Sequence, residues 1–179
     1  MMIGAAGTLV ASPLEGALAR GAPAAAGDFD FLHGRWTVHH RKLVRRLAGS
    51  NDWIGFPGTL EVRPILGGHG NIDENVLEDP GGTYLATSIR IFDAGAGTWS
   101  IYWADARFGG LDAPVTGRFE GRIGRFYGND VFEGRPIRVR TTYENLGTTH
   151  AQWTQAFSPD GGKNWETNWI MDFRREASR

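Results

Sequence analysis

Short extended segments alternate with turn signals along most of the chain. In each segment β-branched and aromatic residues are frequent, and the segments are about 6 to 11 residues long, as in antiparallel barrels and sandwiches. No stretch has the apolar periodicity of a long helix, so an α/β fold is disfavoured. We expect ten strands: Trp36 to Leu47, Thr59 to Leu66, Asn71 to Leu77, Tyr84 to Phe92, Thr98 to Asp105, Ala113 to Glu120, Arg125 to Phe132, Pro136 to Tyr143, His150 to Phe157 and Trp165 to Arg174.

The connections between these segments are short and rich in Gly, Asn, Asp and Pro, for example Asp79-Pro80-Gly81-Gly82 and Ser158-Pro159-Asp160-Gly161-Gly162. Such residues suit tight turns, because Gly, Asn and Asp tolerate positive φ and Pro presets its own. Short connections favour pairing between neighbouring strands, and closure of the sheet removes its exposed edges. We therefore predict an all-β fold, a single antiparallel up-and-down barrel of about ten strands with room for one small ligand.

The stretch from Asp30 to Trp36 marks the start of this barrel. A short helical turn is expected at Phe29 to His33, and Trp36 is expected to plug one barrel end while Gly34 lets the chain turn beneath it. The last segment, ending near Phe173, is expected to pair with the first. The predicted organisation is a leader at 1–28, a barrel domain at 29–175 and a tail at 176–179.

The leader is rich in Ala and Gly, and Pro13 and Pro23 argue against one continuous helix. Its Ala24-Ala25-Ala26 patch imitates the cleavage site of a secretion signal, but the basic region that such a signal carries is missing. A poorly ordered or weakly helical leader is favoured over a signal peptide.

Composition excludes several classes of function. The net charge is -1 and the pI about 6.5, so there is no basic surface to attract nucleic acid or anionic lipid. The chain has no cysteine, which excludes disulfides and thiolate chemistry and fits a cytoplasmic location. No apolar run is long enough for a membrane helix. Seven Trp, ten Phe and four Tyr indicate an aromatic-lined interior.

Four segments together resemble a bacterial family of unknown function with a lipocalin-like, or calycin, barrel. They are Phe31-Leu32-His33-Gly34-Arg35-Trp36, Gly67-Gly68-His69-Gly70-Asn71-Ile72-Asp73-Glu74-Asn75, Thr98-Trp99-Ser100-Ile101-Tyr102-Trp103-Ala104-Asp105 and Glu166-Thr167-Asn168-Trp169-Ile170-Met171-Asp172-Phe173. The likeness spans about residues 29 to 175 and implies the fold, but it implies no reaction because a fold does not fix a function.

Strand parity selects the residues that could face a cavity, since alternate side chains point to opposite faces. Trp99, Ile101, Trp103 and Asp105 share one face, which we expect to point inward. The plainer interpretation is that the tryptophans are core residues and Asp105 belongs to a turn. Trp153 and Trp169 on later strands are further candidate ligand-binding residues.

The segment Asn71 to Leu77 has one face with Ile72, Glu74 and Val76 and another with Asn71, Asp73 and Asn75. If the more apolar face is internal, Glu74 is a desolvated carboxylate with a raised pKa, suited to acid–base catalysis. The alternative is a structural ion pair of Glu74 with Arg90 or Arg140. Asp73 and Asn75 are then expected in solvent or in turns.

Arginine and histidine residues add further candidates. Arg138 and Arg140 form a solvent-facing strip in one interpretation, whereas in the other Arg140 points inward and holds a ligand carboxylate. His40 shares parity with Trp36 and is the histidine expected inside. His39 and His40 point in opposite directions, so they cannot bind one metal ion, and no metal site is predicted.

Three functions follow from these features. The first is a small-molecule binding protein with an apolar or aromatic ligand in a Trp-lined cavity and no cofactor. The second is a cofactor-independent isomerase, cyclase, lyase or dehydratase in which Glu74, Asp105 or His40 moves a proton and Arg90 or Arg140 steadies an anion. The third is haem binding in the manner of nitrobindins. Outer residues such as Tyr102 and Ile170 leave room for a homodimer.

Overall fold

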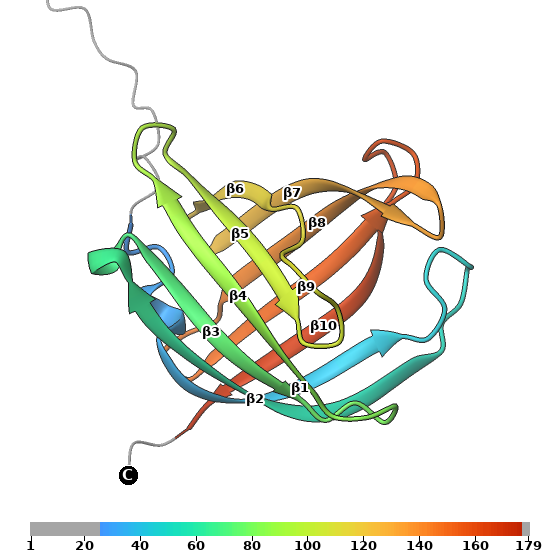
Figure 1. The fold of residues 1–179 in the computed structure, drawn as a ribbon, viewed down its shortest axis with the longest axis horizontal. Coiled ribbons are helices and arrows are strands. Elements are labelled where there is room, and N and C mark those ends of the chain that lie inside the picture. Colours follow the sequence, from blue (N-terminus) through green and yellow to red (C-terminus); the bar gives the residue numbers. More distant parts are fainter. Residues whose placement is uncertain (1–25, 177–179) are drawn as a thin grey trace, which may run out of the picture.

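The computed structural model describes residues 26–176, and within them ten antiparallel strands close into one barrel (Figure 1). Each strand pairs with its neighbours in sequence, and the last pairs with the first, which confirms the predicted all-β, lipocalin-like meander. The strands are β1 (Gly34–Leu43), β2 (Trp53–Ile65), β3 (Gly70–Leu77), β4 (Tyr84–Asp93), β5 (Thr98–Asp105), β6 (Val115–Glu120), β7 (Ile123–Phe132), β8 (Arg135–Asn145), β9 (His150–Ser158) and β10 (Glu166–Arg175).

Helical structure in the described part of the chain is limited to two single turns, η1 (Asp30–Leu32) and η2 (Leu66–Gly68). Neither is long enough or apolar enough to cross a membrane. The features predicted for 1–25 of the leader and for 177–179 of the tail lie outside the described residues.

One end of the barrel is closed by η1 and an aromatic cluster. Trp36 is completely buried, and its indole N–H donates a hydrogen bond of 2.8 Å to the carbonyl of Leu32, which confirms its predicted role as a plug. The Arg175 guanidinium lies 4.1 Å from the Trp36 ring centre and donates to the carbonyls of His33 and Phe31. This arginine therefore joins the end of β10 to the turn before β1, at the seam where the barrel closes.

The strand β2 is longer than predicted, because it begins at Trp53 rather than at Thr59. Gly55, Pro57 and Gly58 made the sequence resemble a loop, yet all three pair with β1. A side chain at Gly58 would place its Cβ 2.5 Å from the Val76 carbonyl and 2.7 Å from Nε2 of His40. The glycine is therefore required by close packing against a buried ring, not by a turn.

The strand β10 contains an irregularity that changes which side chains face inward. Its register against β9 shifts between Thr167 and Trp169, so that Asn168 is an extra, fully buried residue. A bulge of this kind reverses the side-chain alternation on either side of it. Strict alternation along the strand would place Thr167 on the same face as Trp169, Met171 and Phe173, but the bulge turns it outward and Thr167 is exposed.

Candidate functional site

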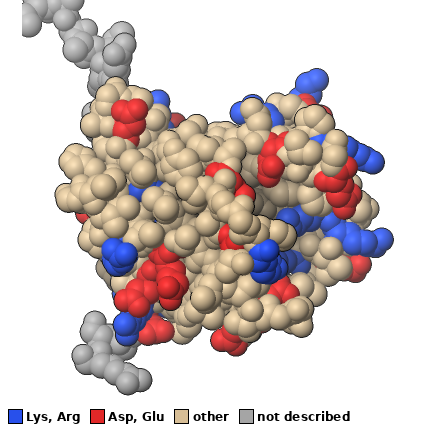
Figure 2. Space-filling model, viewed as in Figure 1, with Lys and Arg blue, Asp and Glu red and all other residues tan. Residues whose placement is uncertain are grey.

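The barrel interior contains a cavity of about 330 Å³ that opens at the end opposite η1. At this end lie the loops that join β1 to β2, β7 to β8 and β9 to β10 (Figure 1). Figure 2 shows charged side chains gathered around a hollow at the same end. The volume is at the lower end of the range for sites that hold small organic ligands, roughly 300 to 1,000 Å³.

Three tryptophans from three strands form much of the apolar wall. Trp103 of β5, Trp153 of β9 and Trp169 of β10 all line the cavity. The Trp153 and Trp169 rings meet edge to face with centres 5.3 Å apart, and Trp103 meets Trp169 in the same way at 5.8 Å. These contacts hold the rings in fixed orientations, so the wall is formed in advance of any ligand.

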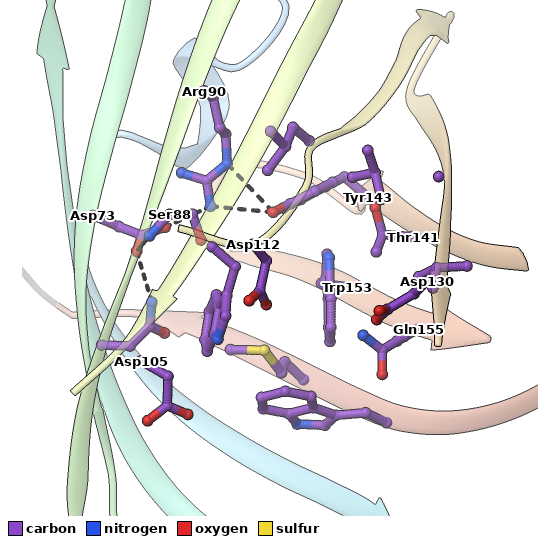
Figure 3. Close-up of a pocket in the computed structure, with 18 of the residues that line it drawn as sticks. Asp73, Ser88, Arg90, Asp105, Asp112, Asp130, Thr141, Tyr143, Trp153 and Gln155 are labelled. Carbon is purple, nitrogen blue, oxygen red and sulfur yellow. Dashed lines mark hydrogen bonds and ion pairs between the residues drawn. The ribbon is translucent and has the colours of Figure 1, made fainter. Parts of the chain in front are cut away.

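The inner end of the cavity carries a buried arginine. The Arg90 guanidinium donates hydrogen bonds of 2.5 Å to the carboxylate of Asp73 and 3.1 Å to the hydroxyl of Tyr143 (Figure 3). It also donates a hydrogen bond of 2.8 Å to the amide oxygen of Asn71. Burial by itself lowers the pKa of Arg90, but Tyr143 and Asp73 outweigh it and leave the pKa raised. The arginine is therefore permanently charged, and most of its donors are already used.

Asp73 is equally well satisfied. Besides the bond from Arg90, its carboxylate accepts hydrogen bonds of 2.7 Å from the side-chain amide of Asn75 and from the backbone N–H of Ser88. Strand pairing between β3 and β4 is interrupted at this point, so the side chain replaces a missing backbone acceptor. A carboxylate with this many donors is a structural element that fixes the cavity floor.

Other polar atoms along the cavity have no partner. Asn75 must direct its N–H toward Asp73, which leaves its Oδ1 free, and the Thr141 hydroxyl and Gln155 Oε1 are likewise buried without a hydrogen bond within the described structure. All three residues line the cavity. Figure 3 shows Thr141 and Gln155 on the wall beside Trp153. Because leaving buried polar groups unpaired is unfavourable, these atoms indicate hydrogen bonds to something inside the cavity.

Lys42 lines the cavity close to its mouth. Its ammonium group lies 4.0 Å from the ring centre of Trp169, donates a hydrogen bond of 2.5 Å to the hydroxyl of Tyr84, and lies 3.6 Å from the carboxylate of Asp79. Burial lowers the pKa of Lys42 from 10.5 to about 8, and the attraction of Asp79 offsets only part of that effect. Burial also raises the pKa of Tyr84, to about 12, so this phenol keeps its proton at neutral pH.

Carboxylates surround the rest of the mouth. Asp105 at the end of β5 is held by Arg107 through two hydrogen bonds, which keep its pKa below the ordinary value. Asp112 follows in the loop between β5 and β6 and points toward the centre of the cavity (Figure 3). Partial burial, together with the negative charges of Asp130 and Asp105, raises its pKa.

The structure brings several predicted site residues together. Trp103, Trp153, Trp169, Arg90 and Asp105 all line the cavity. Trp99 faces inward as predicted, but it lies below the cavity, where its ring packs against Phe29 and Phe92.

The inward placement of Glu74 is wrong, and of the two interpretations of Arg140 the structure supports the solvent-facing one. Glu74 is exposed on the outside of β3, and the polar face with Asp73 is the one that points inward, because Arg90 and Ser88 satisfy it there. Arg140 points outward and stacks on Trp165 at 4.6 Å from the ring centre. Neither residue lines the cavity.

His40 is buried as predicted, but its surroundings do not suit proton transfer near neutral pH. It stacks on Phe56 and accepts a hydrogen bond of 3.3 Å from the indole of Trp169. Burial, reinforced by the charge of Lys42, lowers its pKa from 6.5 to about 3. Among the described residues no histidine lines the cavity, so none is placed to ligate a haem there.

Sequence reasoning missed Lys42, Tyr84 and Thr141. The signal for Lys42 was present, since it continues the inward parity of Trp36, Val38 and His40 on β1. Parity also places Tyr84 with Arg90, on the inward face of β4. Because lysines are mostly exposed in folded proteins, parity alone did not single out Lys42 as a site residue.

Comparison with known proteins adds no assignment: no protein-family model matches the chain, and no significant match to it was found among curated proteins.

Proposed function

We propose that this protein binds a small, mainly aromatic molecule in the barrel cavity. The observation that carries the proposal is the combination of a Trp-walled cavity of about 330 Å³ with unpartnered polar atoms on Asn75, Thr141 and Gln155. Aromatic walls favour a flat apolar body, and the two amide oxygens favour a ligand that carries N–H or O–H donors. One or two rings would fill the space.

Acid–base catalysis has less support as a second function. Glu74 lies outside the barrel, His40 is unprotonated at neutral pH and Asp105 is committed to Arg107. A general acid or base must reach the substrate and have a pKa near the working pH. None of the three predicted residues meets both conditions.

The family resemblance, a cytoplasmic location and a homodimer remain parts of the proposal. The calycin type agrees with a closed ten-strand meander that has a tryptophan at its closed end. Tyr102 and Ile170 are half-buried on the outer face, where a second copy would pack. Gel filtration with light scattering distinguishes a dimer from a monomer.

The binding experiment uses N-phenylnaphthylamine, an uncharged aromatic amine whose fluorescence rises in apolar surroundings. We expect saturable binding by the natural protein. Thr141→Phe fills the cavity and should weaken binding by roughly tenfold or more, a loss of about 1.4 kcal/mol or greater. The matched control is Thr142→Phe, because Thr142 is the next residue on β8 and faces outward.

Circular dichroism confirms that both variants fold. Equal affinity in the two variants, or no saturable binding by the natural protein, would contradict the proposal. A native mass spectrum of freshly purified protein tests it independently, since a retained aromatic molecule should leave when Thr141 is replaced by Phe.

A further inference from the structure

The choice of basic residues in this chain is unusual. Of its 19 lysines and arginines, only Lys42 and Lys163 are lysines. Lys163 is exposed in the turn between β9 and β10, whereas Lys42 points into the barrel. Apart from the pairs that involve histidine, every other ion pair among the described residues is made by an arginine. One of them is the fully buried pair of Arg90 with Asp73. The cavity mouth therefore carries a lysine in a protein that otherwise relies on arginine.

Lysine differs from arginine in a property that matters chemically. A guanidinium keeps its charge under all ordinary conditions, whereas an ammonium group that is desolvated can lose its proton and become a nucleophilic amine. With a pKa of about 8, roughly a quarter of Lys42 is neutral at about pH 7.5. A lysine with the ordinary pKa would be neutral in only about one molecule in a thousand.

Groups on several sides of Lys42 desolvate its ammonium group and lower its pKa. Trp169 lies against the ammonium group, and Phe56 and Tyr84 follow with ring centres at 5.1 Å. The charged groups that act on it are Asp79 in the loop before β4 and two arginines, Arg46 and Arg107. The arginines oppose the lysine's charge and Asp79 is 3.6 Å away, so the ion pair compensates only part of the desolvation.

We propose that Lys42 captures carbonyl ligands covalently, forming an imine with an aromatic aldehyde that occupies the cavity. The inference rests on the proposed binding function, because the aldehyde must first enter the same cavity. Lys42 and Tyr84 border that cavity together with the unpartnered Thr141 and Gln155. One ligand can therefore contact the amine at the mouth and the polar atoms farther along the wall.

The reaction balances without a further reactant. The lone pair of the neutral amine forms a bond to the carbonyl carbon, the carbon–oxygen π bond breaks, and one proton passes from nitrogen to oxygen to give a neutral carbinolamine. The nitrogen then gives up its second proton as the carbon–nitrogen double bond forms, while the hydroxyl takes up a proton, the carbon–oxygen bond breaks and the oxygen leaves as water. The products are the imine and one water molecule, and nothing is oxidised or reduced.

Tyr84 is placed to assist this reaction. Its hydroxyl lies 2.5 Å from the nitrogen of Lys42 and stays protonated at neutral pH. Once the amine is neutral, the phenol can donate a hydrogen bond to the oxygen that forms on the adjacent carbon. The Arg107 guanidinium stacks 3.5 Å from the Tyr84 ring centre and helps to hold the ring in this position.

The test treats the whole protein with naphthaldehyde and sodium cyanoborohydride, which reduces an imine to a stable amine, and locates the adduct by peptide mapping. At about pH 7.5 we expect Lys42 to be modified at least roughly tenfold faster than Lys163 in the same molecule, because the Lys42 amine is partly neutral and the cavity concentrates the aldehyde beside it. The comparison within one chain cancels differences in reagent and folding.

Three variants refine the test. Lys42→Arg keeps the charge but should abolish the cavity adduct, Lys163→Arg should leave the rate at Lys42 unchanged, and Tyr84→Phe should slow that rate several-fold when it is measured at saturating naphthaldehyde. Equal modification of the two lysines in a protein that binds N-phenylnaphthylamine would overturn the imine inference and leave the binding function intact. Failure to bind that probe would contradict both.

Discussion

Arg90 and Lys42 are both buried cations in the same barrel, but their charges are compensated to different degrees. Arg90 at the inner end has partners on β3 and β8 that use its planar donors, and its pKa is raised. Lys42 at the mouth has one hydrogen bond, one ion pair at 3.6 Å and an aromatic surround, and its pKa falls to about 8. Compensated burial produces structure, whereas incompletely compensated burial produces a reactive group.

The largest effect is expected when the compensated pair is broken. Arg90→Met leaves Asp73 as a buried carboxylate without its counter-ion, and it should reduce the free energy of unfolding by about 3 to 5 kcal/mol. Urea denaturation measures the loss. Arg118→Met, at an exposed position of β6, is the control and should change little. A cost below about 1 kcal/mol at Arg90 would mean that its network does not hold the barrel together.

A strong pH dependence should separate the two cations. The rate of imine formation at Lys42 should rise roughly 15-fold between about pH 6.5 and 8, because the reactive amine is the deprotonated form and its pKa is about 8. Tyr84, with a pKa of about 12, and His40, with a pKa of about 3, do not titrate in this interval. Initial rates of adduct formation give the profile. A flat profile would show that the amine is not the group being titrated.

Replacing Lys42 by an apolar side chain should reduce stability much less than replacing Arg90 does. Lys42→Met leaves Asp79 near solvent at the mouth, so we expect a stability change of about 1 kcal/mol or less, in either direction, at neutral pH. The measurement is the same urea titration used for Arg90→Met. If Lys42→Met lost as much free energy of unfolding as Arg90→Met, Lys42 would have a structural role like that of Arg90.

The smallest change in stability is expected at Glu74, the residue next to the buried carboxylate of Asp73. Glu74→Gln, on the outer face of β3, should change stability by no more than about 0.5 kcal/mol and leave the affinity for N-phenylnaphthylamine unchanged. Asp73→Asn on the inner face should destabilise the protein measurably, since it removes the negative partner of Arg90. If the two variants behaved alike, the assignment of inner and outer faces on β3 would be wrong.

The fold was predictable from the sequence because its signals are local. Alternating side chains and short turns rich in Gly, Asn and Asp predict a meander without any long-range information. The parity of Trp99, Trp103 and Asp105 was right for the same reason, since β5 has no bulge to disturb it. Trp36 was correctly identified as the plug because it lies at the start of the first long strand, directly after the expected helical turn.

The candidate site was less predictable, because its residues acquire their properties from partners on other strands. Ile72 and Val76 suggested an inner face, yet Asp73 lies inside because Arg90, 17 residues away, pairs with it there. The bulge at Asn168 places Thr167 on the outside of the barrel, and no local sequence pattern predicts that bulge.

The sequence by itself therefore determined a closed antiparallel barrel with an aromatic interior, since backbone alternation and turn chemistry act over a few residues. The tertiary structure alone decided which polar groups lie inside and what state they adopt. Lys42 is a reactive amine only because β2, β4 and β10 place Phe56, Tyr84 and Trp169 around it and exclude the water that would keep it charged.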